Sequence, residues 1–154
     1  MASVAGIKII ASNKSAFYEY EVVERYEAGI ELTGTEVKSI RAGKVNLSDG
    51  WVGFSSAGEA WLKQVHISPY DQGNRFNHTE NRERRLLLHR SEISKLVDAV
   101  ERKGFTVVPL KIFLKGGWVK VEVAIARGKK LHDKRADSKE KTANREMARA
   151  LRHR

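Results

Sequence analysis

One run of basic and apolar side chains has the chemistry to bind a nucleic acid. It reads Arg82-Glu83-Arg84-Arg85-Leu86-Leu87-Leu88-His89. Guanidinium groups can contact phosphates bidentately, and an exposed leucine or histidine side chain can stack against an unpaired base. The alternative is a core strand that follows a solubilising charge run, and the residues alone favour that alternative.

Other cations are weaker candidates for the same role. Lys38 and Arg41 lie three residues apart on one face of an expected helix, so they can reach neighbouring phosphates. Lys120 lies on the outward face of an expected strand. Solvated helix faces and barrel exteriors routinely carry such residues, so neither signal is specific.

The positive charge is concentrated at the end of the chain. Residues 127–154 hold eleven of the 29 Lys and Arg residues and four of the 19 Asp and Glu residues, which is +7 of the net charge of +10. This excess favours polyanionic partners by Coulomb attraction and counterion release. Composition alone does not choose between RNA, DNA and an anionic lipid surface.

The apolar stripe of this basic segment is thin, because it consists of Ala143, Met147 and Leu151. Such a stripe buries too little surface to offset the entropy lost on ordering. We therefore predict that residues 128–154 form a tail that is disordered when free and folds as a helix along a phosphate-lined channel. The alternative is a solvated tail that only raises solubility, and charge alone leaves both open.

Signals of an enzyme are weak. The histidines are scattered, and no P-loop, HExxH or GxSxG pattern occurs. Glu19 and Glu21, with Glu24 and Glu27, suggest a metal-dependent nuclease. However, alternate residues on a strand share a face by geometry, so solvent-facing carboxylates are the better explanation. We expect no catalytic residue and no cofactor.

Cysteine content and the pattern of apolar residues indicate the cellular compartment. The chain has no cysteine, which excludes a disulfide and a thiolate metal site and fits a reducing compartment. Its first residues lack the charged n-region of a signal peptide, and no apolar run approaches the roughly 18 residues of a membrane span. We expect a cytoplasmic protein with no membrane partner.

Hydrophobic periodicity predicts a strand and a short helix near the start. Residues 16–26 interleave aromatic and β-branched residues with polar ones, which is typical of a half-buried strand. Thr33 and Glu36 form a capping-box pattern, and Gly43 can end the helix that follows.

The middle of the chain predicts a hairpin and then a loop. Residues 50–55 and 59–66 are expected to pair about a tight turn. Residues 69–85 lack either period and indicate an exposed loop, which leads into a short apolar strand at residues 86–88.

A second helix and a second hairpin are expected after that strand. Ser91 can cap a helix that ends at Gly104. Residues 105–115 and 118–127 flank Gly116-Gly117, a pair suited to a type I′ turn. One face of the last strand should be core, and the other should face solvent or a ligand.

These elements predict a mainly β protein with two or three short helices. Strands that follow one another without intervening helices favour an antiparallel β-barrel over βαβ units, and an OB-like barrel is the natural candidate. We expect residues 1–127 to form this barrel and residues 128–154 the basic C-terminal tail.

Several short segments follow one another in a characteristic order along the chain. They are Asn13-Lys14, Glu19-Tyr20, Glu27-Ala28-Gly29, Gly34-Thr35-Glu36-Val37-Lys38-Ser39-Ile40-Arg41, Arg84-Arg85-Leu86-Leu87-Leu88 and Gly128-Lys129-Lys130-Leu131-His132-Asp133-Lys134-Arg135. In this order and at this separation they resemble the SsrA-binding protein family, and the resemblance runs from residue 8 to the end.

The resemblance implies a fold and a function. The fold is a closed, six-stranded, OB-like antiparallel barrel. The ligand is the tRNA-like domain of transfer-messenger RNA, in which the protein fills the place of an anticodon stem. Together with elongation factor Tu, the complex is expected to enter a 70S ribosome stalled on a broken message, with the tail in the vacant mRNA channel. The expected protein is a non-catalytic monomer.

The resemblance also assigns residues to two contact regions. The RNA-binding surface comprises Asn13, Lys14, Glu27, Lys38, Arg41, Arg84, Arg85, Leu87 and Lys120. The proximal tail at the decoding centre comprises Lys129, Lys130, His132, Asp133, Lys134 and Arg135. Arg85 stands where the family commonly has lysine, so the positive charge is kept.

Two other functions stay open at this point. One is a different OB-fold translation protein or ribosomal protein that binds ribosomal RNA permanently. The other, which we disfavour, is a nuclease that depends on Glu19 and Glu21.

Overall fold

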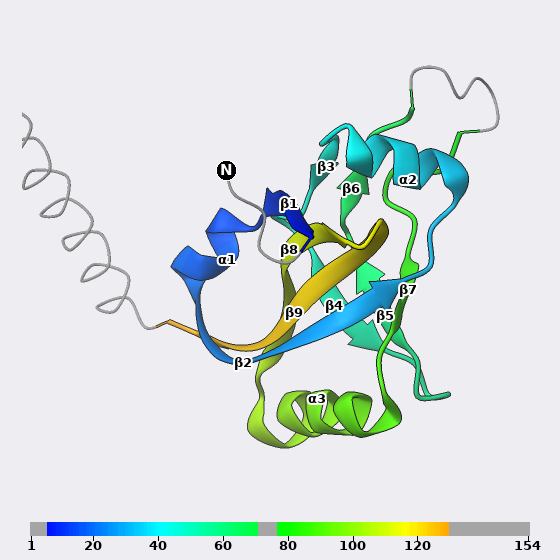
Figure 1. Cartoon of the computed structure of the whole chain (residues 1–154). Helices are drawn as coiled ribbons and strands as arrows, with labels where there is room; N and C mark the ends of the chain where they lie inside the picture. Colours follow the sequence, from blue (N-terminus) through cyan, green and yellow to red (C-terminus); the bar gives the residue numbers. More distant parts are fainter. Residues whose placement is uncertain (1–5, 71–76, 130–154) are drawn as a thin grey trace, which may run out of the picture.

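The computed structural model describes residues 6–70 and 77–129, which form a twisted antiparallel sheet with three helices around it (Figure 1). The elements in chain order are β1 (Ile7–Ser12), α1 (Lys14–Glu19), β2 (Tyr20–Ile30), α2 (Gly34–Arg41), β3 (Val45–Asn46), β4 (Trp51–Phe54), β5 (Ala60–Lys63), β6 (His66–Ile67), β7 (Arg84–Leu87), α3 (Arg90–Lys103), β8 (Thr106–Lys115) and β9 (Trp118–Gly128).

The main sheet joins seven of these strands in the order β1-β8-β9-β2-β7-β5-β4, and β3 pairs with β6 in a small second sheet. The long strands β2, β8 and β9 form its frame. The helix α1 lies at one end of β2, α2 lies at the other end, and α3 lies across the opposite end of the molecule from α2 (Figure 1).

The expectation of a mainly β protein with helices is confirmed, whereas a closed barrel of six strands is not. The main sheet has seven strands, and within the described residues no backbone ladder joins its end strands β1 and β4. One edge of β8 is already occupied by β1 along residues 111–115. Further along β8, Pro109 has no backbone N–H to donate. Both features limit the edge that β8 can offer to β4.

The strand expected over residues 16–26 begins later than predicted, because the short helix α1 precedes it. The side chain of Asn13 accepts a hydrogen bond from the backbone N–H of Ala16 at 3.1 Å and so caps α1. The amide group of Asn13 donates to the carbonyls of Leu47 at 3.1 Å and Pro109 at 2.9 Å. The cap therefore also ties α1 to distant parts of the fold.

The other two helices begin with capping interactions, one of them at an unexpected residue. The Thr33 hydroxyl accepts from the Glu36 N–H, and the Glu36 carboxylate accepts from the Thr33 N–H at 2.8 Å, as predicted for α2. However, α3 begins after His89 rather than Ser91. The carboxylate of Glu92 accepts from the His89 N–H at 3.0 Å, which sets the cap three residues before Glu92.

Both predicted hairpins are present. The β8–β9 ladder ends at the pair Lys115 and Trp118, and Gly116 and Gly117 between them have φ of 57° and 84°, as a type I′ turn requires. The β4–β5 hairpin also forms as expected. Its second strand is shorter than predicted, because His66 belongs to β6 and pairs with β3.

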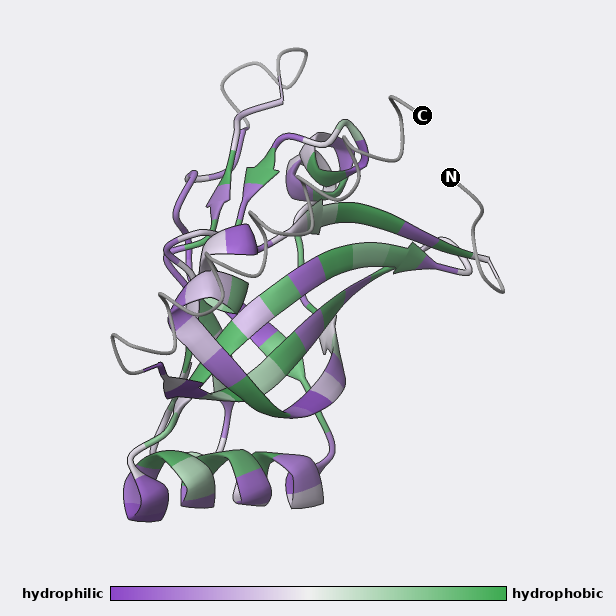
Figure 2. Ribbon diagram, turned by 90° about the vertical axis from the view of Figure 1, so that its left-hand side faces the viewer, coloured by the Kyte–Doolittle hydropathy of each residue, from purple (hydrophilic) through white to green (hydrophobic). Residues whose placement is uncertain are grey.

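Apolar side chains are buried on both faces of the long strands. Val121 and Val123 of β9 lie in the main core, which α3 covers. The opposite face was expected to meet solvent or ligand, but part of it is buried too. There Ala124 and Ala126 pack beneath Ala16 of α1. Figure 2 shows the resulting alternation as green and purple bands along the strands.

The predicted tail lies almost wholly outside the described residues. The strand β9 continues to Gly128, and the description of the chain ends at Lys129. The division into a barrel over residues 1–127 and a tail over residues 128–154 therefore stays a prediction.

Candidate nucleic-acid interface

Four neighbouring strands, β9, β2, β7 and β5, and the start of α3 surround an open pocket of about 360 Å³. Its lining includes Glu27 of β2, Arg85 and Leu87 of β7, and Lys120 of β9, all of which are predicted site residues. The strand order β9-β2-β7 brings them side by side although they are far apart in the sequence. His89, at the start of α3, lies at the same pocket.

Gly29 is the centre of this arrangement. It pairs with Lys120 of β9 on one side and with Leu87 of β7 on the other. A Cβ atom at this position would lie 3.2 Å from the Cβ of Leu87, which is tighter than ordinary packing. The glycine therefore leaves bare backbone between a cation and an apolar side chain. We call the outward surface of Glu27, Gly29, Arg85, Leu87 and Lys120 the Lys120 face.

Charges on the Lys120 face are paired unequally. The Lys115 ammonium lies 3.2 Å from the Glu27 carboxylate, and the Arg85 guanidinium lies 3.4 Å from Glu59. Lys120 has no ion-pair partner among residues 6–70 and 77–129. Its ammonium is therefore available to an external anion, and Leu87, which is 48% exposed, offers apolar surface beside it.

Arg84, next in sequence to Arg85, has a different environment, because its side chain is wholly buried. Its Nε donates to the Glu36 carboxylate, and its other nitrogens donate to the carbonyls of Val65 at 2.7 Å and Glu80 at 3.0 Å. Arg82 donates to the second Glu36 oxygen at 2.6 Å. We call Glu36, Arg82 and Arg84 the buried ion-pair cluster.

In the buried ion-pair cluster the Glu36 carboxylate and the Arg84 guanidinium are fully buried, whereas 37% of the Arg82 side chain is exposed. Burial alone raises the pKa of the Glu36 carboxyl, but hydrogen bonds from Arg82, the Thr33 N–H and Arg84 outweigh it and lower the pKa to about 2. Burial also lowers the pKa of the Arg84 guanidinium, and Glu36 opposes that effect. The cluster fastens α2 to the segment that leads into β7, so it positions the Lys120 face instead of contacting a ligand.

The expectation that Arg84 and Asn13 touch RNA therefore needs correction for this structure. Both side chains are buried, at 0% and 2% exposure, and all their described bonds are internal. Arg84 is buried because strand alternation directs it inward and Arg85 outward. Asn13 is buried because it caps α1.

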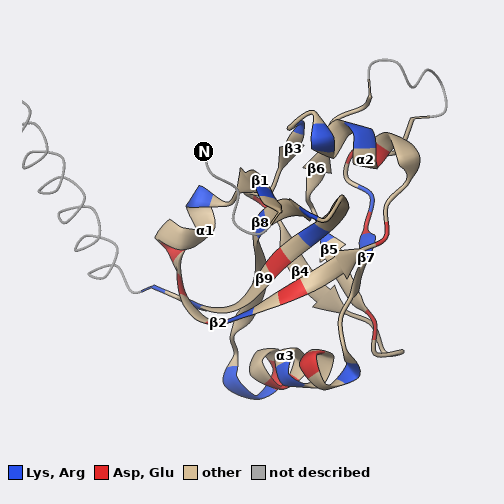
Figure 3. Cartoon of the chain, viewed as in Figure 1, with Lys and Arg blue, Asp and Glu red and all other residues tan. Residues whose placement is uncertain are grey.

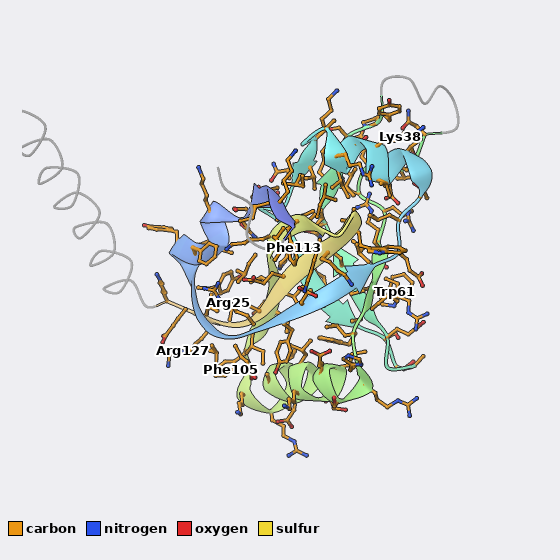
Figure 4. The ribbon with its side chains drawn as sticks, viewed as in Figure 1. Arg25, Lys38, Trp61, Phe105, Phe113 and Arg127 are labelled. Atoms are coloured by element: carbon orange, nitrogen blue, oxygen red, sulfur yellow. The ribbon has the colours of Figure 1, made fainter. Side chains whose placement is uncertain are left out.

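The two predicted cations of α2 lie at the end of the molecule opposite α3 (Figure 3). Lys38, labelled in Figure 4, holds its ammonium 5.4 Å from the centre of the Tyr70 ring. Arg41 donates to the carbonyl of Gly117 at 3.3 Å. The second contact ties α2 to the β8–β9 turn, close to the Lys120 face.

Two other predicted residues lie far from the Lys120 face. Lys14, the first residue of α1, is exposed. The Lys129 ammonium donates to the Phe17 carbonyl at 3.1 Å. The strand β2 separates this end, at Tyr20, from Gly29, a span of roughly 30 Å. The structure thus divides the predicted surface between two ends of one strand. Lys130, His132, Asp133, Lys134 and Arg135 lie outside the described residues.

The basis of the nuclease alternative does not hold. Glu19 ends α1 while Glu21 lies in β2 and pairs with Arg127, so the two do not share a strand face. In the described part of the chain, no group of three or more His, Asp or Glu side chains could hold a metal ion. Likewise, none of the described helices is long and apolar enough to cross a membrane.

A family model described as SmpB protein matches residues 10–153. The chain belongs to the SmpB family. The SsrA-binding protein of Nostoc punctiforme is 58% identical over 147 residues, which are 95% of this chain and 94% of the relative. That of Bacillus cytotoxicus is 56% identical over 147 residues, which are 96% and 94% of the two chains.

A solved structure extends the SmpB match to the fold. It is described as "tmRNA-SmpB: a journey to the center of the bacterial ribosome" and is similar with a TM-score of 0.67 and 45% identity. The match covers 82% of this chain and 87% of the other. The resemblance stated from sequence motifs is therefore confirmed at the level of the family.

Two features of this SmpB chain were missed in the sequence. Gly29 shapes the Lys120 face, and only its register against Lys120 and Leu87 reveals this. Trp118 follows the glycine turn and is 75% exposed. Its position directly after Gly116-Gly117, the predicted hairpin turn, is the sequence signal that could have identified Trp118 as exposed.

Proposed function

We propose that this protein binds the tRNA-like domain of transfer-messenger RNA and delivers it to stalled ribosomes for trans-translation. The observation that carries the proposal is the SmpB family match over residues 10–153. The relatives are named for binding SsrA, and the similar solved structure is described as tmRNA-SmpB in the bacterial ribosome.

The chemistry of the Lys120 face supports an RNA ligand. Lys120 can neutralise a phosphate, and the half-exposed Arg85 guanidinium can add a bidentate contact once it leaves Glu59. Leu87 can pack against a sugar or an unstacked base. Side chains from separate strands fix the spacing of these contacts, so the face can recognise the shape of a folded RNA.

Other predicted cations extend the proposed contact in two directions. Lys38 and Arg41 of α2 continue the positive surface past the β8–β9 turn. Lys14 supplies charge at the far end of β2. An RNA that reaches both ends would lie along the outer surface of the long strands.

The proposed tail acts separately from the globule. Residues 130–154, which follow the end of β9 at Gly128, are disordered in the free protein and enter the empty mRNA channel as a helix. The decoding centre is contacted by Lys129, Lys130, His132, Asp133, Lys134 and Arg135. Ribosomal phosphates supply the counter-charges that order them, and His132 stacks on a ribosomal base.

Further parts of the proposal concern how the protein works in the cell. It is a cytoplasmic monomer that performs no chemical step and carries no cofactor, and it travels with the charged RNA and elongation factor Tu. Its sheet functions as an OB-like barrel, with β4 facing β8 across the gap in hydrogen bonding.

RNA identity tests the proposal directly. We expect sequencing of the RNA crosslinked to this protein in cells to be dominated by transfer-messenger RNA, with contacts in its tRNA-like domain. Crosslinks only to ribosomal RNA, with the protein present stoichiometrically in purified ribosomes, would instead support a permanent ribosomal protein.

The proposed division of labour has its own experiment. Deletion of residues 130–154 should leave affinity for the tRNA-like domain largely intact and abolish peptide tagging on ribosomes stalled in a purified translation system. A large loss of RNA affinity would refute the division while leaving the RNA ligand itself in place.

A further inference from the structure

The most exposed large hydrophobic side chain in residues 6–70 and 77–129 is Trp118, the first residue of β9. It is 75% exposed, compared with 48% for Leu87 and 39% for Trp51. An indole buries a large apolar area when it finds a partner, so an indole left in water at a hairpin tip indicates a binding surface.

Trp118 is held on a rigid support. It pairs with Lys115 across the last rung of the β8–β9 ladder, directly before the two-residue glycine turn. The Arg41 guanidinium donates to the Gly117 carbonyl at 3.3 Å and so fastens the turn to α2. A ligand that stacks on the indole therefore does not have to order a loose loop first.

Trp118 and Lys120 share one face of β9. Residues two apart on a strand point the same way, and the register confirms it, since Trp118 pairs with Lys115 and Lys120 with Phe113 of β8. Their Cα atoms are therefore about 7 Å apart along the strand. A flat aromatic surface and an unpaired ammonium thus stand within the reach of a single nucleotide.

The neighbouring carboxylates are neutralised. Glu27 pairs with Lys115 at 3.2 Å, and Glu122 pairs with Arg25 at 3.1 Å. Repulsion of a phosphate at Lys120 is correspondingly weak. Arg41 donates to the carbonyl of Gly117, the residue before Trp118, and Lys120 lies two residues after it on the same strand face. These cations near Trp118 favour a nucleic acid over an apolar protein surface.

We propose that Trp118 is a stacking platform for one unpaired nucleobase of the bound RNA, whose adjoining phosphate lies at Lys120. The inference rests on the proposed function, because the nucleobase belongs to the RNA that the Lys120 face holds. Stacking is tolerant of base identity, so Trp118 selects a looped-out base over a paired one without selecting its sequence.

Binding of a tRNA-like-domain transcript tests the inference. Trp118→Ala and Trp118→Leu should each lower the affinity on the order of 10-fold, whereas Trp118→Phe should stay within a few-fold of the wild type. The leucine variant keeps apolar bulk but removes the aromatic face. The salt dependence should not change, because no charge is removed. Circular dichroism checks that each variant is folded.

Fluorescence supplies an independent measurement. In a W51F/W61F background Trp118 is the sole tryptophan, and stacking should quench its emission when the tRNA-like transcript is added. A blunt RNA duplex without unpaired bases should leave the emission almost unchanged. If this background does not fold, the affinity series in the otherwise unchanged chain still decides the matter.

The outcomes separate the two proposals. If the wild type does not bind the tRNA-like transcript, the proposed function fails. If the wild type binds and Trp118→Leu binds as tightly as Trp118→Phe, RNA binding stands and stacking is overturned. If Trp118→Ala keeps full RNA affinity but loses association with ribosomes, the indole meets a protein or ribosomal surface, which also overturns the inference.

Discussion

The buried ion-pair cluster and the Lys120 face contain similar charged side chains in opposite circumstances. In the cluster, Glu36 is held between two arginines and Arg84 also bonds backbone carbonyls. On the face, Lys120 has no described ion-pair partner and Arg85 keeps only a half-exposed one. Charges satisfied inside the fold set its geometry, and charges left unsatisfied outside are those that a polyanion can use.

The largest effect should come from breaking the cluster. Arg84→Met leaves the buried Glu36 carboxylate with one arginine partner, Arg82, and loss of one member of a buried pair costs about 3–5 kcal/mol. We expect a drop of that size in the free energy of unfolding, measured by urea denaturation followed by circular dichroism.

Arg85→Met is the matched control on the same strand. Its pair with Glu59 is partly exposed, so the loss of stability should stay below about 1 kcal/mol. Equal losses for the two variants would show that the two arginines do not differ as the comparison requires.

Strong acid should weaken the cluster by protonating the Glu36 carboxylate. The folded pKa of Glu36 is about 2, below its ordinary value of 4.5, so its contribution to stability is fully present above pH 4.5 and is lost as the pH falls toward 2. A shift of this size corresponds to about 3 kcal/mol. Glu36→Gln should be less stable at pH 7 and should lose less stability over this range. A parallel loss in both proteins would contradict the assignment.

The features predicted from the sequence are those with local signals. The α2 capping box needs only Thr33 and Glu36, and the β8–β9 turn needs only Gly116 and Gly117. By contrast, α1 was missed because its cap, Asn13, is held by carbonyls 34 and 96 residues away. No local period reports such contacts.

The candidate site was predicted in part for the same reason. Motif resemblance pointed to both Arg84 and Arg85, but strand alternation makes one inward and one outward without saying which. The choice depends on Glu36, 48 residues away, which takes Arg84 as its partner. The gathering of Glu27, Leu87 and Lys120 likewise follows from strand order, which the sequence did not specify.

On the Lys120 face, removal of the unpaired cation should weaken binding without affecting the fold. Lys120→Ala should reduce affinity for the tRNA-like transcript about 5-fold and lower the slope of log affinity against log salt by roughly one contact. Lys95→Ala, an exposed lysine on α3, is the control and should change neither quantity. An unchanged slope for Lys120→Ala would remove this residue from the interface.

The smallest effect should come from filling the gap between the cation and the apolar side chain. Gly29→Ala places a Cβ 3.2 Å from the Cβ of Leu87, an atom that moves only with the backbone, so β7 must shift by a few tenths of an ångström at a cost of about 0.5 kcal/mol. We expect stability to change little and RNA affinity to fall two- to three-fold, on the order of 0.5 kcal/mol, because the methyl group occupies the bare backbone between Lys120 and Leu87. Gly34→Ala, where nothing lies within 4 Å of the added Cβ, should leave binding unchanged. Equal affinity for Gly29→Ala and the wild type would mean that the ligand does not enter this gap, which would confine the contact to the side-chain tips of the Lys120 face.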